Sequence, residues 1–186
     1  MPPTPHWCVK IGPSDSLEQG DLLDGVPCPS PRYSVGIDYT RKGANVGVPV
    51  KVRRIAVMTH TCDVRKVPRI LLCPVKSYDS LKTEGKPLAD ARAQTLVERG
   101  VHPAFFLIHA SAPDGPDLGE LVVEFRDQSL ISKAWLQDFA YKAGVRLRLQ
   151  ENIQIALLHR FGEFFSRPLI DDEEEVGASE EPESPP

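Results

Sequence analysis

The segment His60-Thr61-Cys62-Asp63 holds the residue types of a reactive thiol site. A cysteine becomes nucleophilic when a neighbouring base or cation favours its thiolate, and His60 and Asp63 supply such groups. Side chains adjacent in a turn rarely converge on one atom, however. Three interpretations therefore stay open: a thiol centre on Cys62, a structural turn capped by Asp63, and a part of some other binding site.

The same segment suggests a metal site if Cys73 joins His60 and Cys62, with Cys28 or Cys8 completing the set. Structural zinc sites usually contain closely spaced C-x2–4-C pairs, and the four cysteines form none. We therefore expect no bound metal and no other cofactor. We also expect four free thiols, because a reducing compartment disfavours disulfides.

Basic residues surround two short apolar runs in the middle of the chain. The set that could track an RNA backbone comprises Arg53, Arg54, Arg65, Lys66, Arg69 and Lys76, with Arg41, Lys42 and Lys51 near it. Clustered cations bind phosphates by displacing counterions. A solvated surface is the alternative, because the set lacks the interleaved aromatic residues that stack on single-stranded bases.

Short apolar runs bounded by turn residues predict a mainly β domain with a few helices. The predicted strands cover 17–26, 50–59, 69–77, 103–109, 120–125 and 145–149, and the segment 33–48 is expected to be a loop with a strand fragment. The strands at 50–59 and 69–77 are expected to be antiparallel neighbours joined by a turn at 60–68. Helices are predicted over 88–100 and 150–166, and a short strand or helical turn over 129–139.

Charge and composition predict three segments. An irregular arm at 1–16 precedes a folded domain at 17–170, and 171–186 is expected to be a disordered acidic tail. The tail carries eight acids and no base, so a chain of net charge −4 has a body of +4. No run approaches the roughly 18 apolar residues of a membrane span, and the start lacks the parts of a signal peptide. We therefore expect a cytoplasmic protein without a membrane segment.

Three groups of residues together resemble a protein family. Residues 53–59, Arg-Arg-Ile-Ala-Val-Met-Thr, and 73–77, Cys-Pro-Val-Lys-Ser, are similar to the paired central strands of MazF/PemK-like toxins, whose patterns are R-P-x-V-V-L-S and A-P-I-T-S. Gly20-Asp21-Leu22-Leu23 resembles the opening Gly-Asp-Ile-Val of that barrel. Residues 57–64, 103–107 and 160–167 resemble an uncharacterised bacterial branch with the motifs V-L-S-Q-[ST]-C-D-L, Pro-x-Phe-Tyr-Leu and R-F-x-x-F-F-x-R.

The resemblance implies an SH3-like β-barrel of the MazF/PemK type, with one inserted helix and a C-terminal helix, in a bacterial toxin-antitoxin or stress and defence system. Members of the family are metal-independent endoribonucleases, which places Arg53, with Thr59 or Ser77, as candidate catalytic residues. Lys76 and Arg54 replace the family's threonine and proline. The chain is therefore expected to be either an active ribonuclease or a module that has lost cleavage and contacts RNA or a protein.

The expected partners are RNA, a protein such as an antitoxin, a protease or a sigma-like factor, and a second copy of the chain. A non-catalytic scaffold barrel that holds a partner protein is the alternative function. A cysteine-based enzyme centred on Cys62 is the third.

Overall fold

A computed structural model describes residues 6–29 and 49–166 of the chain. The strands are β1 (Cys8–Ile11), β2 (Asp21–Pro29), β3 (Val50–Val57), β4 (Arg69–Ser77), β5 (Phe105–His109), β6 (Glu120–Glu124), β7 (Ser129–Ser132) and β8 (Arg146–Leu149). The helices are α1 (Thr61–Val64), α2 (Tyr78–Leu81), α3 (Ala91–Glu98), α4 (Lys133–Ala143) and α5 (Glu151–Phe165). The segment 33–48 and the tail 171–186, for which a loop and disorder are predicted, lie outside the described residues.

One antiparallel sheet connects all eight strands, which confirms the prediction of a mainly β fold. Its order is β1-β8-β2-β3-β4-β6-β5, and β7 pairs with β4 beside this path. The predicted antiparallel pair β3–β4 is present, with Arg54 opposite Val75. The strands predicted at 103–109 and 120–125 are also present and pair as the antiparallel hairpin β5–β6. Among the described strands no ladder joins β1 to β5, so the pairings do not close a barrel.

Alternation along β3 and β4 explains why each strand contains an uninterrupted apolar run, at 55–57 in β3 and at 70–73 in β4. Ile55 and Val57 belong to one buried cluster, and Ala56 and Met58 belong to another. Successive side chains of a strand point to opposite faces, so a strand covered on both faces needs apolar residues at every position. Helix α5 covers one face through Leu157, and α4 covers the other through Leu136 and Ala140.

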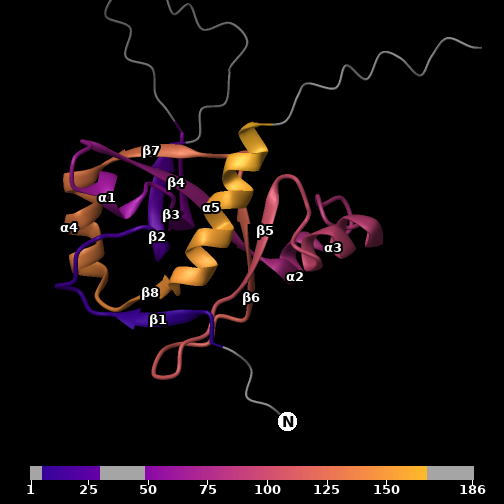
Figure 1. Cartoon of the computed structure of the whole chain (residues 1–186), viewed down its shortest axis with the longest axis horizontal. Helices are drawn as coiled ribbons and strands as arrows, with labels where there is room; N and C mark the ends of the chain where they lie inside the picture. The colour runs from indigo at the N-terminus through magenta and orange to yellow at the C-terminus, as the bar shows by residue number, and fades with distance from the viewer. Residues whose placement is uncertain (1–5, 30–48, 167–186) are drawn as a thin grey trace, which may run out of the picture.

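Figure 1 shows α5 lying across the middle of the molecule, with α1 and α4 at one side and α2 and α3 at the other. The predicted closing helix and the predicted strand at 145–149 are confirmed as α5 and β8. The helix predicted at 88–100 is shorter, because Asp90 caps α3 by accepting a hydrogen bond from the Ala93 N–H. The segment 129–139 is a strand followed by a helix, β7 and then α4.

Two predictions about the N-terminal part are wrong. Residues 8–11 of the supposedly irregular arm form β1, which pairs with β8. Strand β2 does not end at its prolines but continues through Pro27 and Pro29. The reason is its position: β8 pairs only with Asp21 and Leu22, so among the described strands the remainder of β2 has one edge without a ladder, where a missing N–H costs no ladder hydrogen bond.

A buried ion network ties the loop before β2 to β8. The Asp21 carboxylate has no exposed surface and accepts hydrogen bonds from Arg146 Nε at 2.9 Å and Arg148 Nε at 2.5 Å. The other Arg146 nitrogens donate to the carbonyl oxygens of Gly12, Asp15 and Ser16. Every charge in the network has a partner, so this cluster is structural.

Within the described ranges, no helix combines the length and the apolar character that crossing a bilayer requires.

Candidate nucleic-acid interface

The strand pair β3–β4 forms a groove at the end where three predicted RNA-contacting residues lie. Arg54 faces Val75 across the ladder, so Arg53 and Lys76 are the next opposing pair and share one face of the sheet. The groove encloses about 340 Å³ and is lined by Lys51, Val52, Arg53, Arg54, Pro74, Val75, Lys76 and Asp127. The confirmed pairing of β3 with β4 thus places these three cations around one groove.

Each of these three cations has a carboxylate partner that the sequence did not indicate. Arg53 pairs with Asp127 in the turn after β6. Lys76 Nζ lies 2.5 Å from Glu124 Oε2 at the end of β6. Arg54 Nη2 lies 2.6 Å from Asp24 Oδ2 in β2.

These acids come from β2, β6 and the turn after β6, so no local pattern around residues 53–76 could have revealed them. Glu124 directly follows the buried run Leu121–Val123, and its own burial is the one feature that marks it as unusual. Carboxylates of the same chain therefore neutralise Arg53, Arg54 and Lys76 in the groove.

The candidate catalytic hydroxyls do not converge on Arg53. Thr59 lies six residues further along the strand direction, on the order of 20 Å away at ~3.3 Å per residue. Its Oγ1 accepts a hydrogen bond of 2.8 Å from the Leu71 N–H and so extends the β3–β4 ladder. Ser77 adjoins Lys76 in β4, so its side chain leaves the opposite face from Lys76 and Arg53.

A second group of cations lies at the other end of β4, about 23 Å from Lys76 by strand length. Arg65 and Lys66 follow α1, Arg69 begins β4, and Lys133 begins α4. The ladder places Arg69 opposite Ser132, and Lys133 Nζ donates to the Arg65 carbonyl oxygen at 3.0 Å. We call Arg65, Lys66, Arg69 and Lys133 the cationic turn.

Within residues 6–29 and 49–166, no side chain of the cationic turn forms an ion pair. The structure thus divides the predicted RNA-contacting set into a neutralised groove and an uncompensated turn. Sequence reasoning missed Lys133, because only the β4–β7 pairing brings it beside Arg65.

The predicted thiol centre has the geometry of a helix cap. His60, not Asp63, caps α1: its Nδ1 accepts a hydrogen bond of 3.3 Å from the Cys62 backbone N–H. The prediction of a capping Asp63 is therefore wrong, although the structural turn itself is present. Cys62 is exposed, whereas Cys8, Cys28 and Cys73 are buried.

The metal alternative finds no geometric support in the part of the chain that the structure describes. No three histidine, cysteine, aspartate or glutamate side chains there gather around a point that could hold an ion. Cys73 lies inside the core cluster beneath α5, away from the exposed Cys62.

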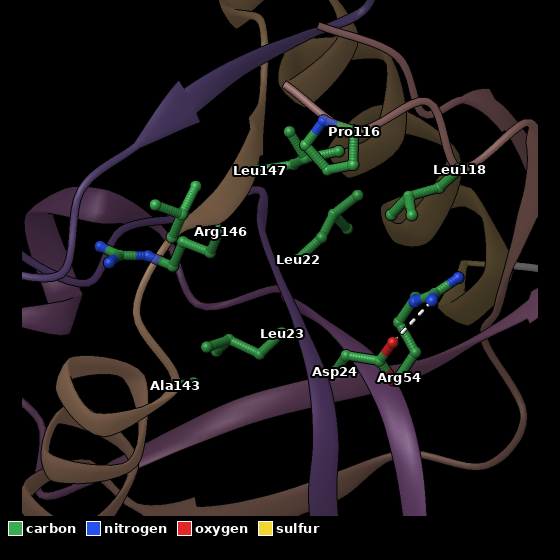
Figure 2. Close-up of a pocket in the computed structure, with 10 residues that line it drawn as sticks. Leu22, Leu23, Asp24, Arg54, Pro116, Leu118, Ala143, Arg146 and Leu147 are labelled. Carbon is green, nitrogen blue, oxygen red and sulfur yellow. Dashed lines mark hydrogen bonds and ion pairs between the residues drawn. The ribbon is translucent and has the colours of Figure 1, made fainter. Parts of the chain in front are cut away.

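A pocket of about 260 Å³ lies between β2, β8 and the loop that precedes β6 (Figure 2). Its lining residues are Leu22, Leu23, Asp24, Arg54, Pro116, Leu118, Ala143, Val145, Arg146 and Leu147. Figure 2 shows the Arg54–Asp24 ion pair at one side and the Arg146 guanidinium pointing away from the centre. Apart from that ion pair and Arg146, the lining residues are apolar.

Two features of the described surface could act on a ligand: the unpaired cations of the cationic turn, and the apolar pocket with Arg54 at its rim. Neither contains a nucleophile, a base and an orienting group within hydrogen-bond reach of one another, which covalent catalysis requires. Comparisons with protein-family models and with curated proteins find no match to this chain.

Proposed function

We propose that the chain is a non-catalytic, RNA-contacting module with an SH3-like β-barrel of the MazF/PemK type, acting in a bacterial toxin-antitoxin or stress and defence system. The charge of the cationic turn carries the proposal. Its four cations have no ion pairs with the described residues, whereas Arg53, Arg54 and Lys76 in the groove each have a carboxylate partner. A phosphate chain gains affinity by displacing mobile counterions, and a cation already held by a carboxylate offers little of that gain.

The approach of the two outermost strands supports a barrel. The Cys8 N–H in β1 donates to the carbonyl oxygen of Ser111, two residues after β5, at 3.1 Å. Trp7 and His109 pack edge to face with ring centroids 4.5 Å apart. The ends of the sheet order therefore lie side by side, as they must in a sheet that curves back on itself.

The electrostatics of the groove argue against cleavage. Ribonucleolysis without a metal needs cations free to stabilise a phosphorane-like charge and a general acid or base beside it. Asp127 and Glu124 form ion pairs with Arg53 and Lys76, the cations that would have to stabilise that charge. The two negatively charged carboxylates also repel an incoming phosphate. The Thr59 hydroxyl is engaged at the other end of the strand.

A titration of labelled single-stranded RNA, followed by fluorescence polarisation, tests the proposal. We expect saturable binding at about 50 mM salt that weakens strongly by about 200 mM salt, and RNA that stays intact on a denaturing gel. Absence of binding at the lower salt would overturn the RNA-contacting role. Cleavage in metal-free buffer that disappears in Arg53→Ala would show that the chain is a ribonuclease.

An exposed aromatic residue favours a second candidate function, the binding of a protein. Phe165 at the end of α5 is 59% exposed, and its ring packs edge to face on Phe161 and Phe164 at 5.0 Å. Such a ring suits an antitoxin, a protease, a sigma-like factor or a second copy of the chain. Light scattering of the native chain and Phe165→Ser would reveal a homodimer through this ring, because only the native chain would have twice the monomer mass.

A further inference from the structure

The pocket in Figure 2 carries a cation whose hydrogen-bonding capacity is only partly used. Arg54 Nη2 donates to Asp24, but Arg54 Nε is buried and has no hydrogen-bond partner. The Asp24 side chain is 71% exposed, so its carboxylate is held by one contact at the surface. Arginine binds a carboxylate best through two parallel hydrogen bonds, and this ion pair supplies one.

The rest of the pocket is apolar and open to solvent. Of its lining residues, Leu22 and Leu147 are buried, Leu118 is partly buried, and Val145 is 51% exposed. The second cation of the lining, Arg146, directs its guanidinium to Asp21 and to three carbonyl oxygens. Among the residues that line this pocket, Arg54 is therefore the cation that a ligand could engage.

We infer that this pocket binds a small carboxylate with an apolar chain. The carboxylate would take two parallel hydrogen bonds from the terminal nitrogens of Arg54 in place of Asp24, and the chain would cover Leu22, Leu118 and Leu147. A volume of about 260 Å³ is below the roughly 300–1,000 Å³ of drug-sized sites, which limits the ligand to a small molecule. The site is independent of RNA contact, because the cationic turn contributes no residue to its lining.

The experiment is a titration of the ¹⁵N-labelled full chain with octanoate, followed by amide chemical shifts, with 1-octanol as the uncharged probe of equal chain length. We expect saturable shifts at Leu22, Leu23, Leu118 and Leu147. We also expect octanoate to bind about tenfold more tightly than octanol, because a charge-assisted hydrogen bond is worth about one factor of ten. Equal affinities, or shifts confined to other residues, would overturn the inference.

Three variants sharpen the test. Arg54→Gln should abolish the preference for octanoate, whereas Arg92→Gln, which removes an exposed arginine from α3, should leave it unchanged. Asp24→Asn should tighten octanoate binding, because it removes the competing carboxylate while keeping the cation. Weaker octanoate binding in Asp24→Asn would contradict the inference even if Arg54→Gln failed to fold.

Discussion

Burial separates the cysteines into two chemical classes. Burial raises the pKa of Cys8 to about 11 and that of Cys73 to about 12, and it also raises the pKa of Cys28. A raised pKa keeps these three side chains as unreactive thiols at neutral and mildly alkaline pH. Cys62 differs because it is exposed at the start of α1.

This difference predicts selective alkylation. Native protein treated briefly with iodoacetamide near neutral pH should gain one adduct, on Cys62, and protein treated in guanidinium chloride should gain four. Mass spectrometry of the intact chain counts the adducts. Cys62→Ser is the matched control and should gain none in the native state. Rapid native labelling of Cys73 would show that the core beneath α5 is more open than described.

Removal of the Asp21 charge at the centre of the buried ion network should lower the free energy of unfolding strongly. Asp21→Asn leaves the Arg146 and Arg148 guanidinium groups without their shared anion, and breaking a buried pair typically costs about 3–5 kcal/mol. Asp24→Asn is the matched control, because its exposed ion pair with Arg54 is worth about 0–1 kcal/mol. Urea unfolding compares the two. Equal midpoints would show that the network contributes little.

The sequence located the cations of the β3–β4 groove but not the carboxylates that neutralise them. Arg53, Arg54 and Lys76 follow from a motif within two adjacent strands. Their partners depend on how the sheet folds back in space, since Asp127 lies 74 residues from Arg53. A candidate site can therefore be located from a local pattern, whereas its electrostatics depend on tertiary contacts.

At the level of elements, two glycines predict opposite effects of the same substitution. Gly162 lies inside α5, and a Cβ there meets no atom within 4 Å. Gly162→Ala should stabilise the protein by about 0.5–1 kcal/mol, because alanine loses less backbone entropy in a helix.

Gly25 in β2 is the contrasting position. Its φ of +72° lies in the left-handed region, at the bulge between Leu23 and Val26. Gly25→Ala should therefore destabilise the protein by about 1–2 kcal/mol despite the open space around it. Thermal melts compare the melting temperature of each variant with that of the native chain. A lower melting temperature for Gly162→Ala would contradict an open position inside α5.

Elements with a clear periodicity were predictable, and elements held by distant partners were not. The stripe of α5 and the apolar runs of β3 and β4 are local signals. Strand β1 is stabilised by β8, about 140 residues later, and its own four residues carry little pattern. The wrong prediction that β2 ends at its prolines has the same cause, because a strand tolerates proline only where the edge that carries the missing N–H is unpaired.

For the whole molecule, the distribution of charge predicts an effect of the acidic segment on RNA binding. The eight acids of residues 171–186 are covalently tied to a body of net charge +4 and compete with any external polyanion at high effective concentration. A chain ending at Ile170 should bind single-stranded RNA more tightly than the full chain, with the larger difference at low salt.

A full-length chain in which the eight acids are replaced by their amides is the matched control for this truncation. It should bind RNA as tightly as the truncated chain, because both lack the competing charge. Polarisation titrations at two salt concentrations measure the effect. Equal affinities of the native and truncated chains would show that residues 171–186 do not compete for the RNA site.

The measurement that tests the central claim most directly is the salt dependence of RNA affinity in three double variants. Arg65→Gln with Lys66→Gln removes two charges from the cationic turn. Lys86→Gln with Arg92→Gln removes two exposed charges elsewhere. Arg53→Gln with Asp127→Asn removes a groove ion pair without changing the net charge.

We predict that the slope of log affinity against log salt falls in magnitude by about 1.4 for the cationic-turn variant, since each lost phosphate contact on a single strand contributes ~0.7. The charge-matched variant and the groove variant should keep a slope close to that of the native chain. Loss of binding in the groove variant, with a native slope in the cationic-turn variant, would contradict the account and return the RNA site to the β3–β4 groove.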